Sequence, residues 1–230
     1  MLLAIDTSTR YAGVALSDEE RLLSCRFWYS STNHTTQLMP AVSEILTSYG
    51  LTPRDLSGIA VALGPGGFSA LRVGMSVAKG LAMAAQKPLL GVGTLDLEAL
   101  PCLESGLPVC VLLESGRREV ASAYFGVNGQ RVREDVICPP EELLAEVTQQ
   151  TIFCGEGVSP WAASIKEKLG QLAVMIAHHS PASRLWSLAE VGRRRLAAGE
   201  SDDLTTLQPY YLRMPSIGGP KRRDWAPQQS

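Results

Sequence analysis

The sequence predicts an α/β protein made of two similar lobes, and two observations lead to this prediction. Apolar runs of strand length alternate with amphipathic helical segments along the whole chain. The order strand, strand, strand, helix, strand, helix also occurs twice, and each half opens on an apolar strand that ends in an acid, Asp6 or Glu114. We therefore expect a cleft between two lobes, the usual place for a ligand or partner. The predicted first lobe covers 1–104 and is completed by 205–213, the second covers 105–204, and a mobile basic tail covers 214–230.

The first half begins with three apolar runs separated by charged or small residues, which is typical of a strand meander. A helix follows, because Ser30 to Asn33 offer an N-cap, Leu38, Val42 and Ile45 recur at helical spacing, and Gly50 can end it. A second strand–helix–strand unit and a short helix complete the half. The predicted strands are 2–6, 11–16, 22–29, 59–63 and 88–92, and the predicted helices are 35–49, 69–86 and 95–100.

The second half opens with strongly apolar strands. A helix is expected after Pro139 and Pro140, with acids in its first turn that suit the helix dipole. The last helix places Leu185, Leu188 and Leu196 on one side, and Gly199 stops it. The predicted strands are 108–114, 119–127, 130–137, 151–154 and 172–177, the last of them buried, and the further helices are 158–169 and 183–198.

Composition and charge are those of an ordinary globular protein, with 45% hydrophobic residues and a net charge of -2. This balance argues against tight nucleic-acid binding by the chain alone. No apolar run approaches the roughly 20 residues that span a membrane, and Asp6 interrupts the opening Leu2–Ile5 run, so no secretory signal is expected. The five cysteines are scattered without a C-x-x-C pair, which favours a reduced, cytoplasmic setting.

A glycine-rich turn joins a predicted strand to the helix 69–86. Such a turn leaves backbone N–H groups open and aims the positive end of the helix dipole outward, as an anion site requires. A tight strand-to-helix connector is the alternative. Asp6 at the mouth of the cleft also has two possible interpretations: an acid that faces a bound phosphate, or a cap for the turn through Thr7 and Ser8. The predicted nucleotide- or anion-facing residues are Asp6, Thr7, Ser8, Gly64, Pro65, Gly66 and Gly67.

The helix 69–86 is apolar almost all round, whereas a helix that only covers its own sheet needs one apolar stripe. Gly74, Ala78 and Ala82 recur every fourth residue, a spacing that would let a partner helix approach closely. The alternative is that the helix lies sandwiched between its own sheet and the helix 35–49. The predicted partner interface consists of Leu38, Val42, Ile45, Arg72, Gly74, Met75, Ala78, Lys79, Leu81 and Ala82.

Neither a metal site nor a catalytic constellation is expected. The histidines are His34, His178 and His179, and adjacent histidines on a strand end point to opposite faces, so they cannot chelate one ion together. His34 has Leu38, not a ligand, one turn later. The sequence holds no G-x-S-x-G elbow and no Walker-type phosphate loop.

Several motifs together resemble the TsaB (YeaZ) family, the accessory subunits of the bacterial machinery that makes threonylcarbamoyladenosine in tRNA. They are Ile5-Asp6-Thr7-Ser8, Asn33-His34 ahead of Leu38-Met39-Pro40, the segment 64–74, and Pro209-Tyr210-Tyr211-Leu212-Arg213. The resemblance implies a duplicated actin/hexokinase/heat-shock-ATPase-like (ribonuclease H-like) fold. The family's loop usually has serine, threonine and glycine where this chain has Gly67, Ser69 and Ala70. Gly116 stands where the family has an arginine.

The resemblance also implies a role. Thr94 and Glu98 stand where the catalytic relative TsaD has its two metal-binding histidines, so this chain is expected to be a non-enzymatic subunit. The implied partners are a TsaD-type subunit, a TsaE-type ATPase, a second copy of the chain in isolation, and tRNA indirectly. No cofactor is expected on this chain alone, with ATP at a partner interface. Two alternatives stay open: a self-sufficient ATP-dependent phosphotransferase using Asp6 and Glu114, and a homodimeric scaffold that never meets TsaD.

Overall fold

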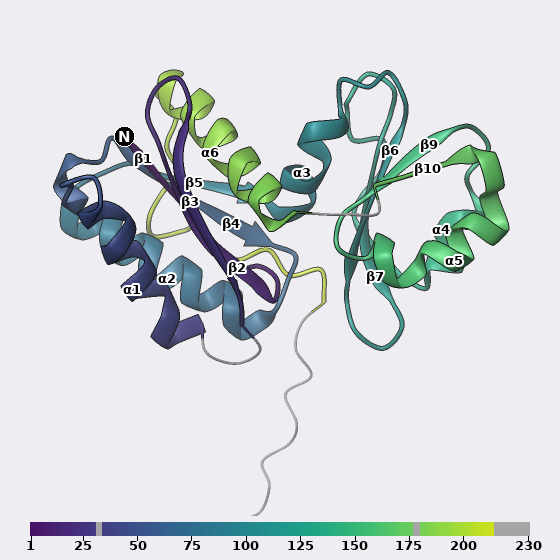
Figure 1. Ribbon diagram of the computed structural model, residues 1–230, viewed down its shortest axis with the longest axis horizontal. Helices are drawn as coiled ribbons and strands as arrows, with labels where there is room; N and C mark the ends of the chain where they lie inside the picture. Colours follow the sequence, from purple (N-terminus) through teal and green to yellow (C-terminus); the bar gives the residue numbers. More distant parts are fainter. Residues whose placement is uncertain (31–33, 177–179, 214–230) are drawn as a thin grey trace, which may run out of the picture.

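The protein, seen in a computed structural model that describes residues 1–30, 34–176 and 180–213, contains two mixed five-stranded sheets (Figure 1). The first sheet has the order β3-β2-β1-β4-β5, with an antiparallel meander on one side of β1 and parallel strands on the other. Its strands are β1 (Leu2–Asp6), β2 (Tyr11–Ser17), β3 (Leu22–Tyr29), β4 (Gly58–Gly64) and β5 (Leu89–Gly93).

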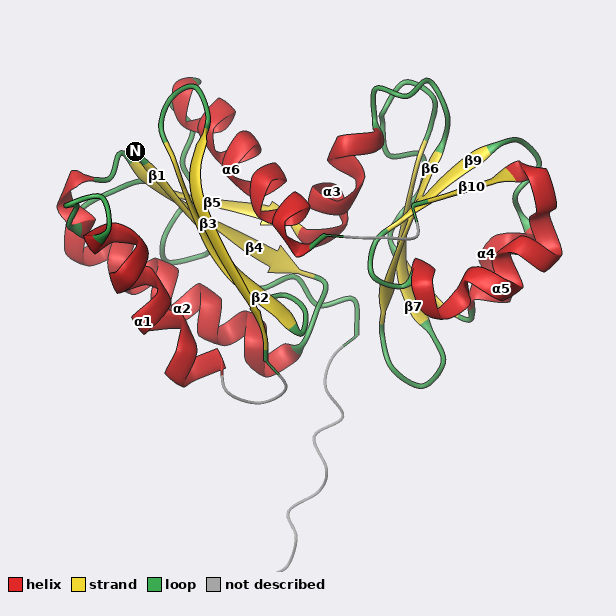
Figure 2. Ribbon diagram, in the orientation of Figure 1, coloured by secondary structure: helices red, strands yellow, loops and turns green. Residues whose placement is uncertain are grey.

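Helices cover both faces of the first sheet (Figure 2). Leu3 and Ile5 of β1 point to the face covered by α1 (His34–Thr47) and α2 (Phe68–Ala85). Leu2 and Ala4 point to the opposite face, where α6 (Pro181–Ala197) packs. Side chains alternate between the faces of a strand, so a strand covered on both faces is apolar on both, as Leu2 to Ile5 of β1 are. The predicted end of α1 is also confirmed, because Gly50 has a φ of 66°.

The second sheet repeats the first, with the order β8-β7-β6-β9-β10 and the same mixture of antiparallel and parallel pairs. The duplicated architecture expected from the sequence is therefore confirmed. Helices α4 (Pro140–Ala145) and α5 (Val158–Leu169) cover its outer face. Its strands are β6 (Val109–Glu114), β7 (Val120–Phe125), β8 (Val136–Cys138), β9 (Thr151–Cys154) and β10 (Ala173–Met175).

The two halves exchange their last helices. Leu95 and Ala99 of α3 (Thr94–Ala99) pack into the core of the second sheet, although α3 follows β5. Leu185 and Leu188 of α6 pack into the core of the first sheet, although α6 follows β10. The predicted second lobe over 105–204 is therefore wrong for α6. Its apolar stripe was correctly identified, but a stripe does not say which of two sheets covers it.

Two strand predictions in the second half need correction. The predicted strand 130–137 is only an isolated bridge at Arg131 followed, after residues outside any strand, by the short strand β8. The predicted buried strand 172–177 is β10, and it lies at the edge of the sheet with Val174 exposed. An edge strand keeps one side open to solvent, which an apolar sequence does not reveal.

The segment 205–213 returns to the first lobe and then reaches the second. The backbone N–H of Tyr210 donates to the carbonyl of Leu63 at 2.8 Å, and the ring of Tyr211 stacks on Phe68 with 4.8 Å between centroids. Arg213 then pairs with Glu119 of the second sheet at 2.7 Å. The segment thus contacts the first lobe beside α2 and the second lobe at Glu119, and so connects the two lobes. No helix within 1–30, 34–176 and 180–213 is long and apolar enough to cross a membrane.

Candidate functional site

A cleft of about 1430 Å³ opens between the two sheets. Its first wall comes from the β1–β2 turn, the ends of β2 and β3, and the glycine turn before α2. Its second wall comes from the β6–β7 turn and the start of α5, and Tyr211 to Arg213 close one side. The cleft therefore lies between the two lobes, where the sequence predicted one, and Glu114 at the end of β6 lines it.

Arg184 of α6 lies under the floor of this cleft and is 1% exposed. Its Nε donates to Asp6, and its Nη1 donates to Glu98 at 2.9 Å and to Glu156 at 2.7 Å. Its Nη2 donates to the hydroxyl of Thr9 at 2.9 Å and to the carbonyl of Tyr11 at 2.8 Å. One guanidinium thus joins β1, α3, α6 and the β9–α5 turn.

The electrostatics of this cluster follow from its burial. Burial disfavours the charge on Arg184, but Asp6, Glu98 and Glu156 outweigh it and raise the pKa of Arg184. Burial raises the pKa of Glu98 to about 7, against the opposing pull of Arg184. Glu98 therefore changes its charge near neutral pH while the guanidinium stays protonated.

Asp6 serves as a turn cap and an ion-pair partner. Its Oδ1 accepts a hydrogen bond from the backbone N–H of Ser8 at 2.8 Å and another from the Ser8 hydroxyl at 2.6 Å, while Oδ2 faces Arg184. The carboxylate is 1% exposed. A metal-bound phosphate at Asp6 would have to displace Arg184, so the residues present here do not fit that role.

The other predicted loop residues divide into two groups. Ser8, Pro65, Gly66 and Gly67 line the cleft, whereas Asp6, Thr7 and Gly64 are buried beneath it. The N–H of Gly67 donates to the carbonyl of Ser8 at 2.9 Å, so the glycine turn packs on the β1–β2 turn. Only glycine fits at position 66, where a Cβ would lie 2.0 Å from that same carbonyl. The tight connector is thus present, and anion binding at this loop stays a prediction.

The predicted partner interface needs a correction. Ala78 and Ala82 have no exposed surface, and Gly74 packs against the hydroxyl of Thr7, so the stripe chosen from the sequence faces the lobe's own core. The helix does not lie between its sheet and α1 either: α1 and α2 pack side by side on the same face of the sheet, which leaves the outer side of α2 open. The buried members of the predicted interface are Leu38, Val42, Ile45, Gly74, Met75, Ala78 and Ala82, while Arg72 is exposed and Lys79 and Leu81 are half-buried.

A different stripe of small residues lies on the outer side of α2. Ser76, Gly80 and Ala84 are exposed and also recur every fourth residue. Met83 beside them is 66% exposed. Val73, Val77 and Leu81 of the same helix are half-buried. We call Ser76, Gly80, Met83 and Ala84, with these three half-buried residues, the outer stripe. The residues predicted from the sequence lie on the inner side of α2, and contact of a partner with this helix stays a prediction.

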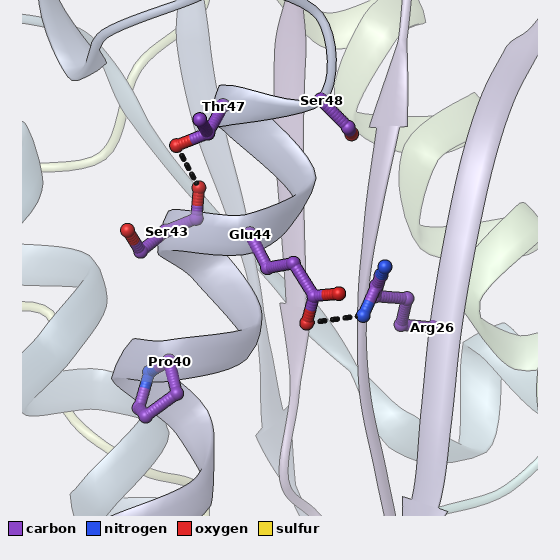
Figure 3. A pocket seen from close by; sticks show the side chains of 6 residues that line it. All are labelled: Arg26, Pro40, Ser43, Glu44, Thr47 and Ser48. Carbon is purple, nitrogen blue, oxygen red and sulfur yellow. Dashed lines mark hydrogen bonds and ion pairs between the residues drawn. The ribbon is translucent and has the colours of Figure 1, made fainter.

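A polar hollow lies between α1 and β3 (Figure 3). Arg26 of β3 forms an ion pair with Glu44 of α1, and the Thr47 hydroxyl donates to the Ser43 carbonyl at 2.7 Å. Both ionised side chains of the hollow are thus paired with each other, which ties the edge strand to α1 and gives the outer side of α1 a polar surface.

Metal-ligating side chains do not converge in the described part of the chain: no group of three or more histidines, cysteines or acids there is placed to hold an ion. His178 and His179 lie outside the described residues. The hydroxyl of Thr94 accepts a hydrogen bond from the backbone N–H of Gly64 at 3.1 Å, and Glu98 accepts one from Arg184.

Arg184, Glu98 and Glu156 were not singled out as a site by the sequence. One signal for Arg184 existed: it precedes Leu188 by four positions and Gly192 by eight, so it continues the apolar stripe of α6. A charge on an apolar helix face is rarely buried without a partner. Its partners lie 178, 86 and 28 residues away in the chain, which no local pattern can reveal.

Duplicated mixed sheets with exchanged helices and a central cleft define this chain as a two-lobed protein of the actin-like ATPase fold class. The comparisons agree. The solved structure of YeaZ from Pseudomonas aeruginosa superposes with a TM-score of 0.72 at 29% identity and covers 92% of this chain and 99% of that one. A Clostridium difficile activator of 2-hydroxyisocaproyl-CoA dehydratase, at 7% identity and a TM-score of 0.54, shares the fold alone.

Sequence relatives settle the family. A family model described as TsaD, tRNA N6-adenosine threonylcarbamoyltransferase, matches residues 29–216. The tRNA threonylcarbamoyladenosine biosynthesis protein TsaB of Escherichia coli is 38% identical, over 92% of this chain and 94% of its own. TsaB of Bacillus subtilis is 30% identical, over 93% and 94%. The chain belongs to the TsaB family of tRNA threonylcarbamoyladenosine biosynthesis proteins, and the resemblance drawn from its motifs is confirmed.

Proposed function

We propose that this chain is a non-enzymatic accessory subunit that docks to a TsaD-type catalytic subunit through the outer faces of α1 and α2. In that complex it supports transfer of a threonylcarbamoyl group to the adenosine beside the anticodon of tRNA. The observation that carries the proposal is the outer stripe of α2. An exposed apolar surface on an otherwise well-packed lobe marks a contact site more often than a chance feature.

The outer stripe suits a helix as its partner. Ser76, Gly80 and Ala84 have short side chains or none, so a second backbone can approach closely along this line. A Cβ added at Gly80 would meet nothing within 4 Å, so the space above the helix is open. Met83 offers a flexible apolar side chain that adapts to a partner surface.

Charged groups sit at the edge of this stripe, as expected for an interface rim. Arg72 stacks on the ring of Phe68, 4.0 Å from its centroid, and its Nε donates to the Tyr211 hydroxyl at 3.3 Å. Lys79 is half-buried between the stripe and the lobe. The C-terminal segment around Tyr211, one of the motifs on which the resemblance rests, would thus border the same surface.

The remaining roles extend this proposal. In isolation the outer stripe packs against the outer stripe of a second copy in a homodimer. The TsaD-type subunit then replaces the second copy. ATP belongs to the partner interface and not to this chain alone, and a TsaE-type ATPase joins the assembled complex. The protein works in the cytoplasm, where its tRNA substrate complex is found.

The test is threonylcarbamoylation of tRNA in a purified system with and without this chain, using Gly80→Arg and the matched control Gly80→Ala. We expect modification with the parent chain and Gly80→Ala, and loss of both modification and co-purification with the TsaD-type subunit for Gly80→Arg. Modification that proceeds equally without the chain would refute the accessory role. ATP turnover by the pure chain would instead favour the phosphotransferase alternative.

A further inference from the structure

We propose that the aromatic wall of the cleft, formed by Tyr11, Phe27 and Tyr29, together with Arg10 and Arg117, binds a single-stranded segment of RNA. These three rings are 39%, 48% and 54% exposed. All five side chains line the cleft between the lobes. The outer stripe of α2 is a separate surface, so this inference concerns a second site; it rests on the proposed function only in taking tRNA as the source of the RNA.

The pairing of β2 with β3 places the rings side by side. Tyr11 pairs directly with Tyr29, and Gly13 pairs with Phe27, so all three rings project from the same face of this ribbon. Tyr11 and Tyr29 form an edge-to-face pair with 5.4 Å between centroids. The side chain of Leu185 covers Gly13 on this face, and α6 begins just beyond it at Pro181, which leaves the rings uncovered.

The charge of the cleft favours an anion, although the chain as a whole carries -2. Arg10 and Arg117 line the cleft together with the acid Glu114. Arg213 and Glu156 line it as well, but Arg213 is paired with Glu119 at 2.7 Å. Glu156 is already paired with Arg184 at 2.7 Å. Arg10 lies beside the rings, because its Nη1 donates to the Tyr29 hydroxyl at 3.2 Å.

Arg117 approaches from the opposite wall in an unusual turn. Gly116, Arg117 and Arg118 follow one another with φ values of 69°, 53° and 62°. L side chains rarely adopt this conformation, so the turn presents two exposed arginines where small residues would be expected. The cleft is therefore lined by cations on both walls.

Exposed rings beside arginines match the chemistry of single-stranded nucleic acid. Unpaired bases stack on aromatic side chains regardless of sequence, while arginines neutralise the phosphates between them. The bases of a duplex are stacked on each other and have no free faces for the three rings to contact. A simple anion would contact the arginines and not the rings. The volume of about 1430 Å³ also exceeds what a single small molecule fills.

The experiment measures fluorescence anisotropy of a labelled mixed-sequence RNA of about 12 nucleotides, a length suited to such sites. The full chain is compared with Tyr29→Leu, Tyr29→Phe, Arg10→Gln and Arg117→Asn, and with the control Arg54→Gln, an exposed cation outside the cleft. We expect Tyr29→Leu to weaken binding about tenfold and Tyr29→Phe to leave it nearly unchanged. Arg10→Gln and Arg117→Asn should each lower the slope of log affinity against log salt by about 0.7, and Arg54→Gln should not.

Other results overturn the inference. If the RNA does not bind at protein concentrations up to about 100 µM in low salt, the inference is refuted, because even non-specific protein–RNA complexes form in that range. Equal losses in Arg54→Gln and in the cleft variants would mean unspecific charge attraction. ATP binding without RNA binding would assign the cleft to a free nucleotide. Gly80→Arg changes the outer stripe and leaves the cleft intact, whereas Tyr29→Leu changes the cleft and leaves the outer stripe intact. A failure of docking and a failure of RNA binding therefore show in different variants.

Discussion

Arg184 donates a hydrogen bond of 2.7 Å to Glu156, and this contact joins a helix packed on the first sheet to the turn after β9 of the second. The same guanidinium holds Asp6 and Glu98, so one buried cation links elements of both sheets. Its charge is satisfied by the protein itself.

Replacement of Arg184 should be among the most destabilising single changes in the chain. Arg184→Met leaves buried carboxylates without a counter-charge, and we expect a loss of about 3–5 kcal/mol in the free energy of unfolding. Arg194→Met on the same helix removes an exposed pair with Glu190 and should cost less than about 1 kcal/mol. Urea unfolding measures both. A loss for Arg184→Met no larger than that of Arg194→Met would show that the cluster does not hold the lobes.

The pKa of Glu98 makes stability depend on pH. That pKa is raised from 4.5 to about 7 on folding, so the folded state binds an additional proton between these values. The contribution of Glu98 to stability is therefore fully present below pH 4.5 and is lost as pH rises through about 7, a change of roughly 3 kcal/mol for this group. Glu98→Gln should lose this dependence. The measurement is the difference in unfolding free energy between parent and variant at pH 5 and pH 7.5, and identical pH profiles would contradict it.

Two alanines on α2 distinguish its inner and outer sides. Ala78 has no exposed surface, so Ala78→Glu buries an unpaired carboxylate and should unfold the first lobe. Ala84 is exposed, and Ala84→Glu should change the free energy of unfolding by no more than about 0.5 kcal/mol while it weakens docking. Thermal unfolding and co-purification with the TsaD-type subunit separate the two effects. A folded Ala78→Glu protein would reverse our assignment of the two sides.

Two glycines should respond to alanine in opposite directions. At Gly66 a Cβ would lie 2.0 Å from the Ser8 carbonyl, so Gly66→Ala must shift the backbone and destabilise the turn. At Gly80 nothing lies within 4 Å of the added Cβ, and alanine is the better helix former, so Gly80→Ala should stabilise by up to about 1 kcal/mol. Denaturant midpoints of the two variants check both signs. A shift in the same direction for both would refute the packing described here.

The sequence by itself determined the elements, their duplicated order and the family. Periodicity and turn residues act within a few positions, so they located β1, α1 and the glycine turn to within a few residues. Several motifs together, among them the segment from Gly64 to Gly74, carried the resemblance that the relatives confirm.

Only the tertiary structure decided where those elements pack. The exchange of α3 and α6, the inward rotation of Ala78 and Ala82, and the meeting of Arg184 with Asp6 all join residues distant in the chain. An amphipathic pattern states that a face is buried and leaves open what buries it. The site under the cleft was hidden for that reason: each of its charges looks like an isolated surface residue until the fold brings them together.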